Sequence, residues 1–285
     1  MDKEIPALVL SASMLLILTA CGNDPAAPAV SFTKEPEPIT EKVEDYNLSL
    51  IVDNWTTYTE HSPIEREGVY TGTLLDGVPD GYGTFTATND DGALWTYTGE
   101  FKNGLFDGQG TVTWEESDAV QTGTFIAGLF SPNTPELFNS ISYTSTPQFL
   151  ISEKNMDFMQ ENLALFPAAT EEALKEMQSY IQTDLTYPMM TKTLDGLEGT
   201  LYHCDRVQAI DVFQDSLYGH TITAIFCGDD ELNFYWIYYD GILPDVYSDV
   251  NISFTALPVS PSSFSNVSGG TTNVIVLIGC SVEVV

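Results

Sequence analysis

The chain has 285 residues and a formal net charge of −32, from 41 acidic residues against 9 Lys and Arg. Its hydrophobic fraction of 43% is ordinary for a folded protein, and its length allows one or two packed domains. A disordered chain is therefore excluded despite the charge. Such a charge repels nucleic acid phosphates and anionic headgroups, and no basic run is present to bind them, so nucleic acid is not an expected partner.

The N-terminus has the pattern of an export signal. Residues 5–20 are an apolar stretch that is short for a membrane span of about 20 residues but suits the hydrophobic region of a signal peptide. The run Leu18-Thr19-Ala20-Cys21 resembles the lipobox of bacterial lipoproteins, although residues 2–4 carry a net negative charge where export signals are usually positive. The alternatives to a lipoprotein signal are a retained membrane helix and a cleaved signal with an ordinary Cys21.

The lipobox resemblance implies that residues 1–20 are removed as a signal peptide. It also implies that Cys21 carries palmitate-like acyl chains. These chains would anchor the protein to the outer face of the bacterial cytoplasmic membrane. Residues 21–62 are rich in Pro, Ala and acidic residues and predict an extended acidic tether. Within it, the apolar piece 48–55 is compatible with a first strand or a first helix of the next unit.

An internal repeat follows the tether. Residues 70–84 and 97–111 share the same residue at eight of fifteen positions, and four of these are glycines. A third, truncated copy begins near Gln121. The Asp-Gly and Asn-Gly pairs readily form tight hairpin turns, so the repeat predicts hairpins. The turn glycines of the three copies are Gly77, Gly104 and Gly128.

The pattern Tyr-x-Gly, Asp/Asn-Gly, Asp-Gly-x-Gly-Thr resembles MORN repeats, complete at about 68–90 and 95–117 and truncated at about 119–130. This resemblance implies an elongated β-hairpin array over residues 63–131 that serves as a scaffold, a homodimer interface or a phospholipid binder. Lipid binding by the array itself is not expected, because residues 64–130 carry eleven acids against two basic residues. The extra residues of the first repeat are assigned to its Asn89-Asp90-Asp91-Gly92 loop.

Residues 132–147 are rich in Pro, Ser and Thr and predict a linker to a second domain, 148–285. Apolar residues at helical spacing predict a first short helix that ends before Pro167. Thr170 is a suitable N-cap for a second short helix, with two glutamates in its first turn.

Five apolar or alternating runs after these helices predict strands. They are residues 199–213, 220–227, 232–239, 250–256 and 274–278. The fold class expected is therefore mainly β, with the hairpin array followed by two short helices and a five-stranded OB-like barrel. The approach to the last strand also resembles OB-like C-terminal domains of secreted proteins from clostridial-type bacteria.

The third barrel strand carries five aromatic residues. Alternation places Phe234, Trp236 and Tyr238 on one face and Tyr235 and Tyr239 on the other. We assign the first set to the barrel core and expect Tyr235 and Tyr239 to stack on a sugar, peptide or aromatic ligand. The alternative is that both sets pack internally.

Cys204 and Cys227 lie on two strands that are expected to form a hairpin, nearly opposite each other, so a disulfide between them is one expectation. Two buried free thiols are the alternative. No zinc-protease helix, nucleophile elbow or phosphate loop is found, and no metal or cofactor is expected. We therefore interpret the protein as a non-enzymatic surface module that binds protein or glycan. The alternative is an envelope hydrolase whose carboxylate pair only the tertiary structure would reveal.

Overall fold

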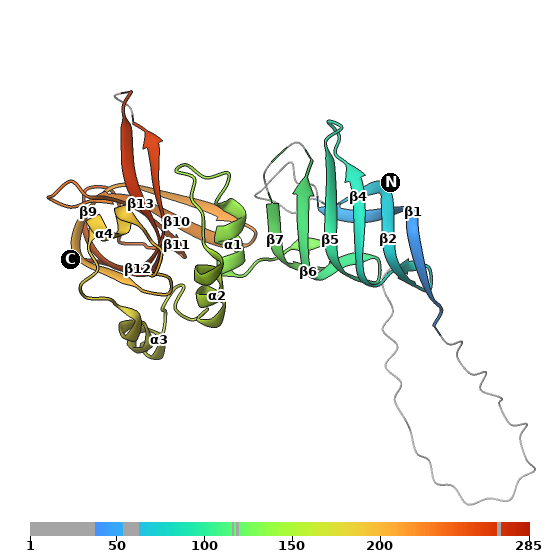
Figure 1. Cartoon of the computed structure of the whole chain (residues 1–285), viewed down its shortest axis with the longest axis horizontal. Helices are drawn as coiled ribbons and strands as arrows, with labels where there is room; N and C mark the ends of the chain where they lie inside the picture. The colour runs from blue at the N-terminus through green and yellow to red at the C-terminus, as the bar shows by residue number, and fades with distance from the viewer. Residues whose placement is uncertain (1–37, 54–62, 116, 118–119, 267–268) are drawn as a thin grey trace, which may run out of the picture. The chain divides into compact units, whose positions relative to one another are not determined.

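The computed structural model describes residues 38–53, 63–115, 117, 120–266 and 269–285 (Figure 1). The chain separates into two units, Met1–Glu37 and Pro38–Val285. The first unit lies outside the described residues, and with it the predicted signal peptide, the lipidation residue Cys21 and the start of the tether. The second unit is mainly β, as the sequence predicts, with a hairpin sheet, short helices and a five-stranded barrel.

The repeats form an antiparallel sheet in the order β1-β2-β4-β5-β6-β7-β8, with β3 paired to β2. Its strands are β1 (Thr40–Asp53), β2 (Pro63–Leu75), β3 (Val78–Pro79), β4 (Gly81–Thr88), β5 (Leu94–Lys102), β6 (Leu105–Trp114), β7 (Val120–Ile126) and β8 (Leu129–Phe130). The chain turns at Gly77, Gly104 and Gly128, where each glycine and the residue before it have positive φ. Two successive residues of positive φ define the tight turn that matches the twist of a hairpin.

The assignment of residues 21–62 to a tether is wrong for residues 40–53. These residues form β1, which pairs with β2 from Thr40 opposite Leu75 to Asp53 opposite Pro63. The physical reason is a period-two apolar pattern at Leu48, Leu50 and Val52, which points toward the core while the acidic side chains of residues 41, 44 and 45 remain exposed.

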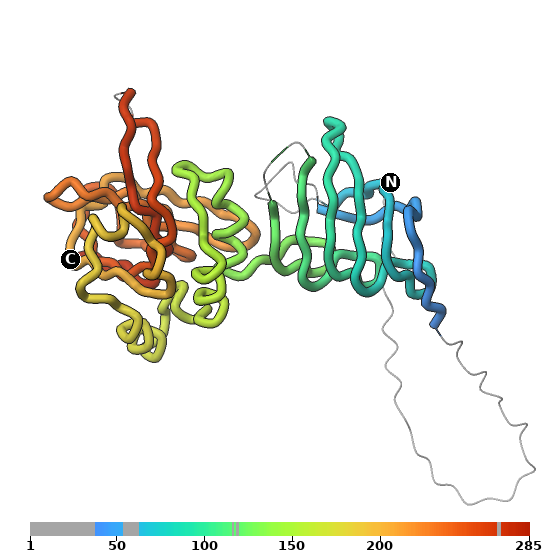
Figure 2. The backbone as a smooth tube through the Cα atoms, viewed as in Figure 1, coloured from blue at the N-terminus to red at the C-terminus, as the bar shows by residue number. Residues whose placement is uncertain are grey.

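The far half of the β1–β2 hairpin crosses the inner face of the repeat sheet (Figure 2). Leu50 and Val52 join the aromatic core that contains Trp95 and Phe106, and β1 contacts β6 and β8. At Gly68, where β2 begins to pair with β4, a side chain would meet the Phe85 ring at 2.5 Å. The hairpin thus covers an aromatic face that a single-layered sheet would leave in water.

The extra residues of the first repeat lie in a loop, as predicted. Residues 89–92 belong to the connection from β4, which ends at Thr88, to β5, which begins at Leu94. The strands that flank this loop are paired up to its ends, Ala87 with Trp95 and Thr88 with Leu94.

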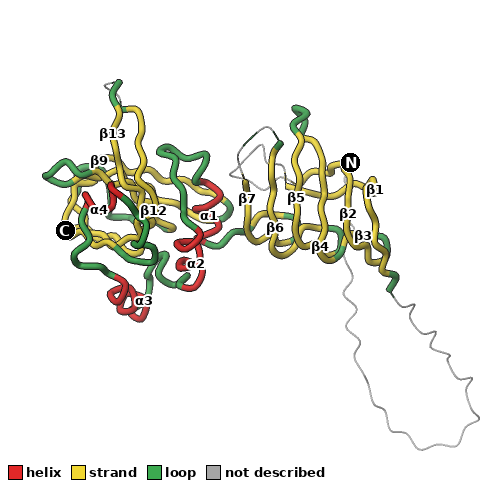
Figure 3. The backbone as a smooth tube through the Cα atoms, viewed as in Figure 1, coloured by secondary structure: helices red, strands yellow, loops and turns green. Residues whose placement is uncertain are grey.

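Four short α-helices and a 3-10 turn separate the sheet from the barrel (Figure 3). They are α1 (Thr134–Ile141), α2 (Glu153–Glu161), α3 (Glu171–Met177), η1 (Gln178–Tyr180) and α4 (Tyr187–Lys192). Helix α1 lies inside the predicted 132–147 linker, and a capping box between Asn133 and Glu136 explains why a Pro- and Ser-rich segment is helical there. Thr170 caps α3 as predicted, accepting a hydrogen bond from Ala173 N.

The last five strands close into a barrel in the order β10-β11-β13-β12-β9. They are β9 (Tyr202–Leu217), β10 (His220–Gly228), β11 (Phe234–Asp240), β12 (Asn251–Ser265) and β13 (Thr271–Val284). All neighbours are antiparallel except β11 and β13, which run parallel. The paired ends of β12 and β13 extend beyond the barrel as an arm, visible in Figure 1.

Candidate binding surfaces

The inner face of the repeat sheet is built from tyrosines that lie over glycines. A side chain added at Gly83 would meet the Tyr70 ring at 2.8 Å, and one added at Gly110 would meet the Tyr97 ring at 2.4 Å. Each tyrosine hydroxyl donates to the backbone carbonyl three residues on, Tyr70 to Thr73 at 2.9 Å and Tyr97 to Glu100 at 2.8 Å. The glycines are needed because only a residue without Cβ lets the ring lie flat on the strands.

Carboxylates at equivalent positions join successive hairpins. Asp80 accepts from Asn103 N at 3.4 Å, and Asp107 accepts from Ala127 N at 3.2 Å. Because both contacts reach the turn of the next hairpin, each unit fixes the position of its neighbour. This is a local reason for the Asp in the Asp-Gly-x-Gly pattern.

The truncated third repeat is completed by the barrel. Gln121 stands where Tyr70 and Tyr97 stand in the complete repeats, and its amide donates to the Tyr218 hydroxyl of the β9–β10 turn at 2.9 Å. The Tyr218 ring packs edge-on against Phe130 with ring centroids 5.0 Å apart. The barrel thereby supplies the aromatic ring that the third repeat lacks.

A charged pair of the barrel contacts the segment that follows the sheet and the start of α1. The His220 ring nitrogens lie 2.8 Å from an Asp240 carboxylate oxygen and 2.9 Å from the Pro132 carbonyl, and the Thr134 hydroxyl donates to the same Asp240 oxygen. The hydrogen bond with Asp240 raises the pKa of His220 above its usual 6.5. With acceptors at both nitrogens, the site favours the doubly protonated ring.

The outer face of the repeat sheet is lined with threonines. Every one of the strands β2, β4, β5, β6 and β7 carries a Thr-x-Thr sequence. Two rows of residues paired across these strands make up what we call the threonine face: Thr71, Thr84, Thr98, Thr111 and Thr122 in one row, and Val69, Thr86, Thr96, Thr113 and Val120 in the other. Three of the ten are exposed and the other seven are half-buried.

Two neighbouring pairs on the threonine face share hydrogen bonds, Thr86 with Thr96 at 3.0 Å and Thr111 with Thr122 at 2.9 Å. None of its ten side chains is ionisable, in a chain whose net charge is −32. The threonine face was not predicted, because glycines and aromatic residues dominate the repeat pattern. The Thr-x-Thr sequence at each strand is the signal that would have revealed it.

The expected ligand-stacking pair, Tyr235 and Tyr239, is not exposed together. Tyr235 is fully buried inside the barrel, where it stacks on Tyr202 and packs against Phe254, and Tyr239 is half-buried against Gly241 and Gly279. The face assignment is therefore wrong. Alternation separates the two sets correctly but does not say which set lies inside, since helices cover part of the barrel's outer surface and bury that set too.

The other aromatic set lies on the outer surface of the barrel. Trp236 stacks with Phe213 and Phe226, and Phe264 of the arm packs edge-on against both Phe226 and Trp236. Phe213 is 49% exposed and Trp236 only 9%. Phe138 and Phe149 cover the adjoining Tyr238, so helix α1 and the segment after it occupy part of this face.

The described cysteines Cys204, Cys227 and Cys280 are free thiols. Cys227 lies opposite Ala209 in the β9–β10 ladder, and Cys204 lies opposite Phe254 of β12. The expected opposite placement of Cys204 and Cys227 is thus wrong, because β9 is long enough to leave β10 and pair with β12 instead. Burial raises the pKa of both thiols.

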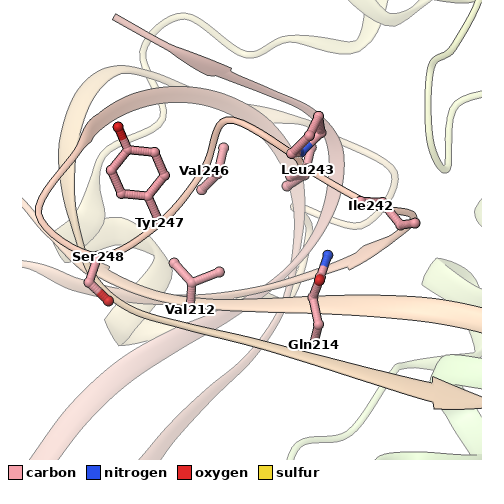
Figure 4. Close-up of a pocket in the computed structure, with 8 residues that line it drawn as sticks. Val212, Gln214, Ile242, Leu243, Val246, Tyr247 and Ser248 are labelled. Atoms are coloured by element: carbon pink, nitrogen blue, oxygen red, sulfur yellow. The ribbon is translucent and has the colours of Figure 1, made fainter.

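A cavity of about 310 Å³ opens between β9 and the loop that joins β11 to β12 (Figure 4). Val212 and Gln214 of β9 point toward the loop, and Val246 helps to line the cavity. Ile242 and Tyr247 are each 63% exposed. The lining combines aliphatic side chains with the Gln214 amide and the hydroxyls of Tyr247 and Ser248, and it carries no charged side chain, so it suits a small uncharged group better than a charged one.

Within the described residues, no cluster of His, Cys, Asp and Glu is arranged to hold a metal ion. No helix among those residues is both long and apolar enough to cross a membrane.

The family model of the MORN repeat matches residues 70–92 and 97–118. The chain therefore contains two MORN repeats, whose hairpins are those that turn at Gly77 and Gly104. The comparisons with curated proteins and with solved structures gave no match.

Proposed function

We propose that the protein is a lipid-anchored, non-enzymatic binding and scaffolding module on the outer face of a bacterial cytoplasmic membrane. MORN repeats suggest a binding or scaffolding role in general. The lipobox-like run before Cys21 supports the anchor, after removal of a signal peptide. The partner is a surface protein or a glycan and not a nucleic acid, because the net charge of −32 opposes polyanion binding.

The threonine face is the surface that carries this proposal. The inner face of the same sheet is filled by its own aromatic core and covered by β1, so only the outer face is available. Threonine favours strands, and paired threonines stabilise a sheet. An unbroken uncharged surface over five strands in so acidic a chain is in addition what recognition of a partner would use.

We also infer that the barrel is OB-like. The order β9-β10-β11-β13-β12 with β11 parallel to β13 supports this assignment. An OB fold usually binds ligands on the outer face of its second and third strands, which are β10 and β11 here. Phe138 and Phe149 already cover Tyr238 on that face, which supports a structural role for the barrel and a binding role for the repeats.

Pairing of two copies through the edge of the repeat sheet stays a prediction. The outermost strand is β1, whose ladder is interrupted by a bulge at Asp45 with φ of 50°. Bulges and acidic side chains disfavour addition of a further strand. Light scattering of the purified chain over a range of concentrations decides whether a dimer forms.

Affinity capture from native membranes tests the binding role. The full chain is compared with the variant Thr98→Lys, which places a charge in the centre of the threonine face, and with Thr191→Lys, which adds the same charge to the exposed surface of α4. We expect an envelope component that the unaltered chain and Thr191→Lys retain and that Thr98→Lys releases. Equal capture by all three proteins would contradict the assignment of binding to this face.

A further inference from the structure

The threonine face has the spacing and chemistry of a surface for an extended chain of neutral sugars. We propose that it binds an uncharged β-linked polysaccharide laid across the strands. This inference rests on the proposed binding role of the same face and names its ligand class. Three features of the face carry this inference: its neutrality, its hydrogen-bonding capacity and the exposed aromatic residue at its border.

The first feature is charge. The ten positions of the two rows hold eight threonines and two valines, while the chain around them is strongly acidic. A cationic partner would find no carboxylate within the rows, and an anionic one would be repelled by the acidic chain. The partner that fits is uncharged and rich in hydroxyl groups.

The second feature is the supply of hydrogen bonds. A threonine hydroxyl has one donor and two acceptor positions. A pair that shares one hydrogen bond, as Thr86 shares with Thr96 and Thr111 with Thr122, still offers one hydrogen and further lone pairs to a ligand. Sugar hydroxyls are likewise both donors and acceptors, so either partner can reorient to complete the contact.

The regular spacing of the strands places these threonine hydroxyls at regular intervals. Neighbouring strands lie about 4.8 Å apart, and residues two apart on a strand are about 6.8 Å apart. A β-linked chain in its extended form advances by about the distance between strands for each sugar. Running perpendicular to the strands from β2 to β7, it would meet one threonine of the Thr71–Thr122 row at each sugar.

The third feature is Tyr82, which lies two residues before Thr84 on the same face of β4 and is 68% exposed. Its exposed ring gives one sugar a flat apolar surface, since aromatic side chains have an apolar body and a polar tip. Glu100 lies opposite Tyr82, and the Gln109 amide bonds to Thr124 at 2.9 Å at the same end of the face. The Tyr82 ring, the Glu100 carboxylate and the Gln109 amide therefore lie along one border of the threonine face.

The test uses the full chain, purified in a detergent that is not a glycoside, and titrates it with chitohexaose and cellohexaose. Maltohexaose, which is α-linked, controls for geometry, and polygalacturonate controls for charge. We expect at least one of the two β-linked chains to bind and both controls to fail. Tyr82→Ala and Thr98→Lys should each weaken this binding by about tenfold or more, while Thr191→Lys leaves it unchanged.

Absence of binding by both β-linked chains overturns the inference, and so does binding that Tyr82→Ala and Thr98→Lys leave intact. Circular dichroism melting of each variant shows that a loss of binding is not a loss of fold. If membrane capture depends on Thr98 while neither sugar binds, the proposed binding role stands with a protein partner and the sugar inference fails. If neither capture nor sugar binding occurs, both fail.

Discussion

Gln121 of the last repeat and Tyr218 of the first barrel turn are joined by a hydrogen bond of 2.9 Å, although 97 positions separate them in the sequence. Gln121 is 5% exposed, and Tyr218 also packs its ring against Phe130, the last aromatic residue of the repeat core. The repeat array thus ends on a residue of the barrel instead of on solvent.

The first prediction concerns Tyr218. Tyr218→Phe removes the hydrogen bond and should lower the free energy of unfolding by about 1 kcal/mol, the usual net contribution of one such bond. Tyr218→Ala also removes the edge-on contact with Phe130 and should cost about 2 kcal/mol. Urea denaturation measures both values. Tyr247→Phe is the control, since Tyr247 is 63% exposed, and equal effects at the two sites would contradict the capping role.

The second prediction is a pH dependence carried by His220. Its pKa is raised in the folded protein, chiefly by the hydrogen bond with Asp240, so folding favours the protonated ring. The groups that face the ring are Asp240 and the Pro132 carbonyl, with Thr134 bonded to Asp240. The resulting stabilisation is fully present below the unfolded pKa of 6.5 and is lost as the pH rises through the folded pKa.

Thermal melting as a function of pH measures this effect, and His220→Gln should remove it. The matched control is His203→Gln, because the His203 side chain is 40% exposed and its partner Asp205 is 99% exposed. A melting temperature that falls equally with pH in the unaltered chain and in His220→Gln would show that the contact with Asp240 is not its source.

The third prediction concerns the glycines under the tyrosines. Gly110→Ala would place a methyl group 2.4 Å from the Tyr97 ring, which is stacked on Phe106, so neither ring can yield easily. We expect a loss of about 3 kcal/mol in the free energy of unfolding, at the upper end of the usual cost of overpacking. Gly92→Ala is the comparison: its φ of 88° strains an alanine, but no atom lies within 4 Å, so about 1 kcal/mol is expected. The reverse order in denaturation experiments would refute the packing explanation.

The fourth prediction distinguishes free thiols from a disulfide. Cys227 is fully buried and its thiol pKa is raised well above 9.0 by burial, whereas Cys204 is partly exposed. An alkylating reagent should therefore modify Cys204 before Cys227 in the native protein, as peptide mass spectrometry would record. Protection of both residues until a reductant is added would instead reveal the disulfide.

The fifth prediction tests the anchor. Cys21→Ser removes the residue that the lipobox resemblance assigns to acylation, so the variant should move from the detergent-rich phase to the aqueous phase in a phase-partition assay. Labelling with a palmitate analogue gives an independent measurement. Unchanged partitioning of the variant would favour a retained N-terminal helix.

The repeat hairpins could be predicted because their geometry restricts the residue type: a tight turn requires Gly104, and a ring lying on the strands requires Gly110. Only the apolar end of strand β1 could be predicted as a possible strand, because its first half has the acidic composition of a tether and gains its structure from pairing with β2. Helix α1 was missed for a similar reason, since its capping box lies within a Pro- and Ser-rich segment.

The aromatic residues of β11 show a different limit. Alternation groups Tyr235 with Tyr239 and Trp236 with Tyr238, but the choice of the inner set depends on barrel closure and on what covers the outside. Both Tyr235 and Trp236 are buried, one by the barrel and the other by packing on its surface, so hydrophobicity alone could not separate them. The threonine face was open to prediction from the Thr-x-Thr pattern.

The aspartates that reach from one turn to the next also bear on how this architecture can evolve. Asp80 and Asp107 hold the turns of successive hairpins at a regular spacing, whereas the repeats differ in length, with 27 residues from Gly72 to Gly99 and 24 from Gly99 to Gly123. One rim of the molecule is thus held constant and the other is free to vary. Insertions that adapt the protein to a new partner can accumulate along the variable rim without disturbing the regular spacing of the array.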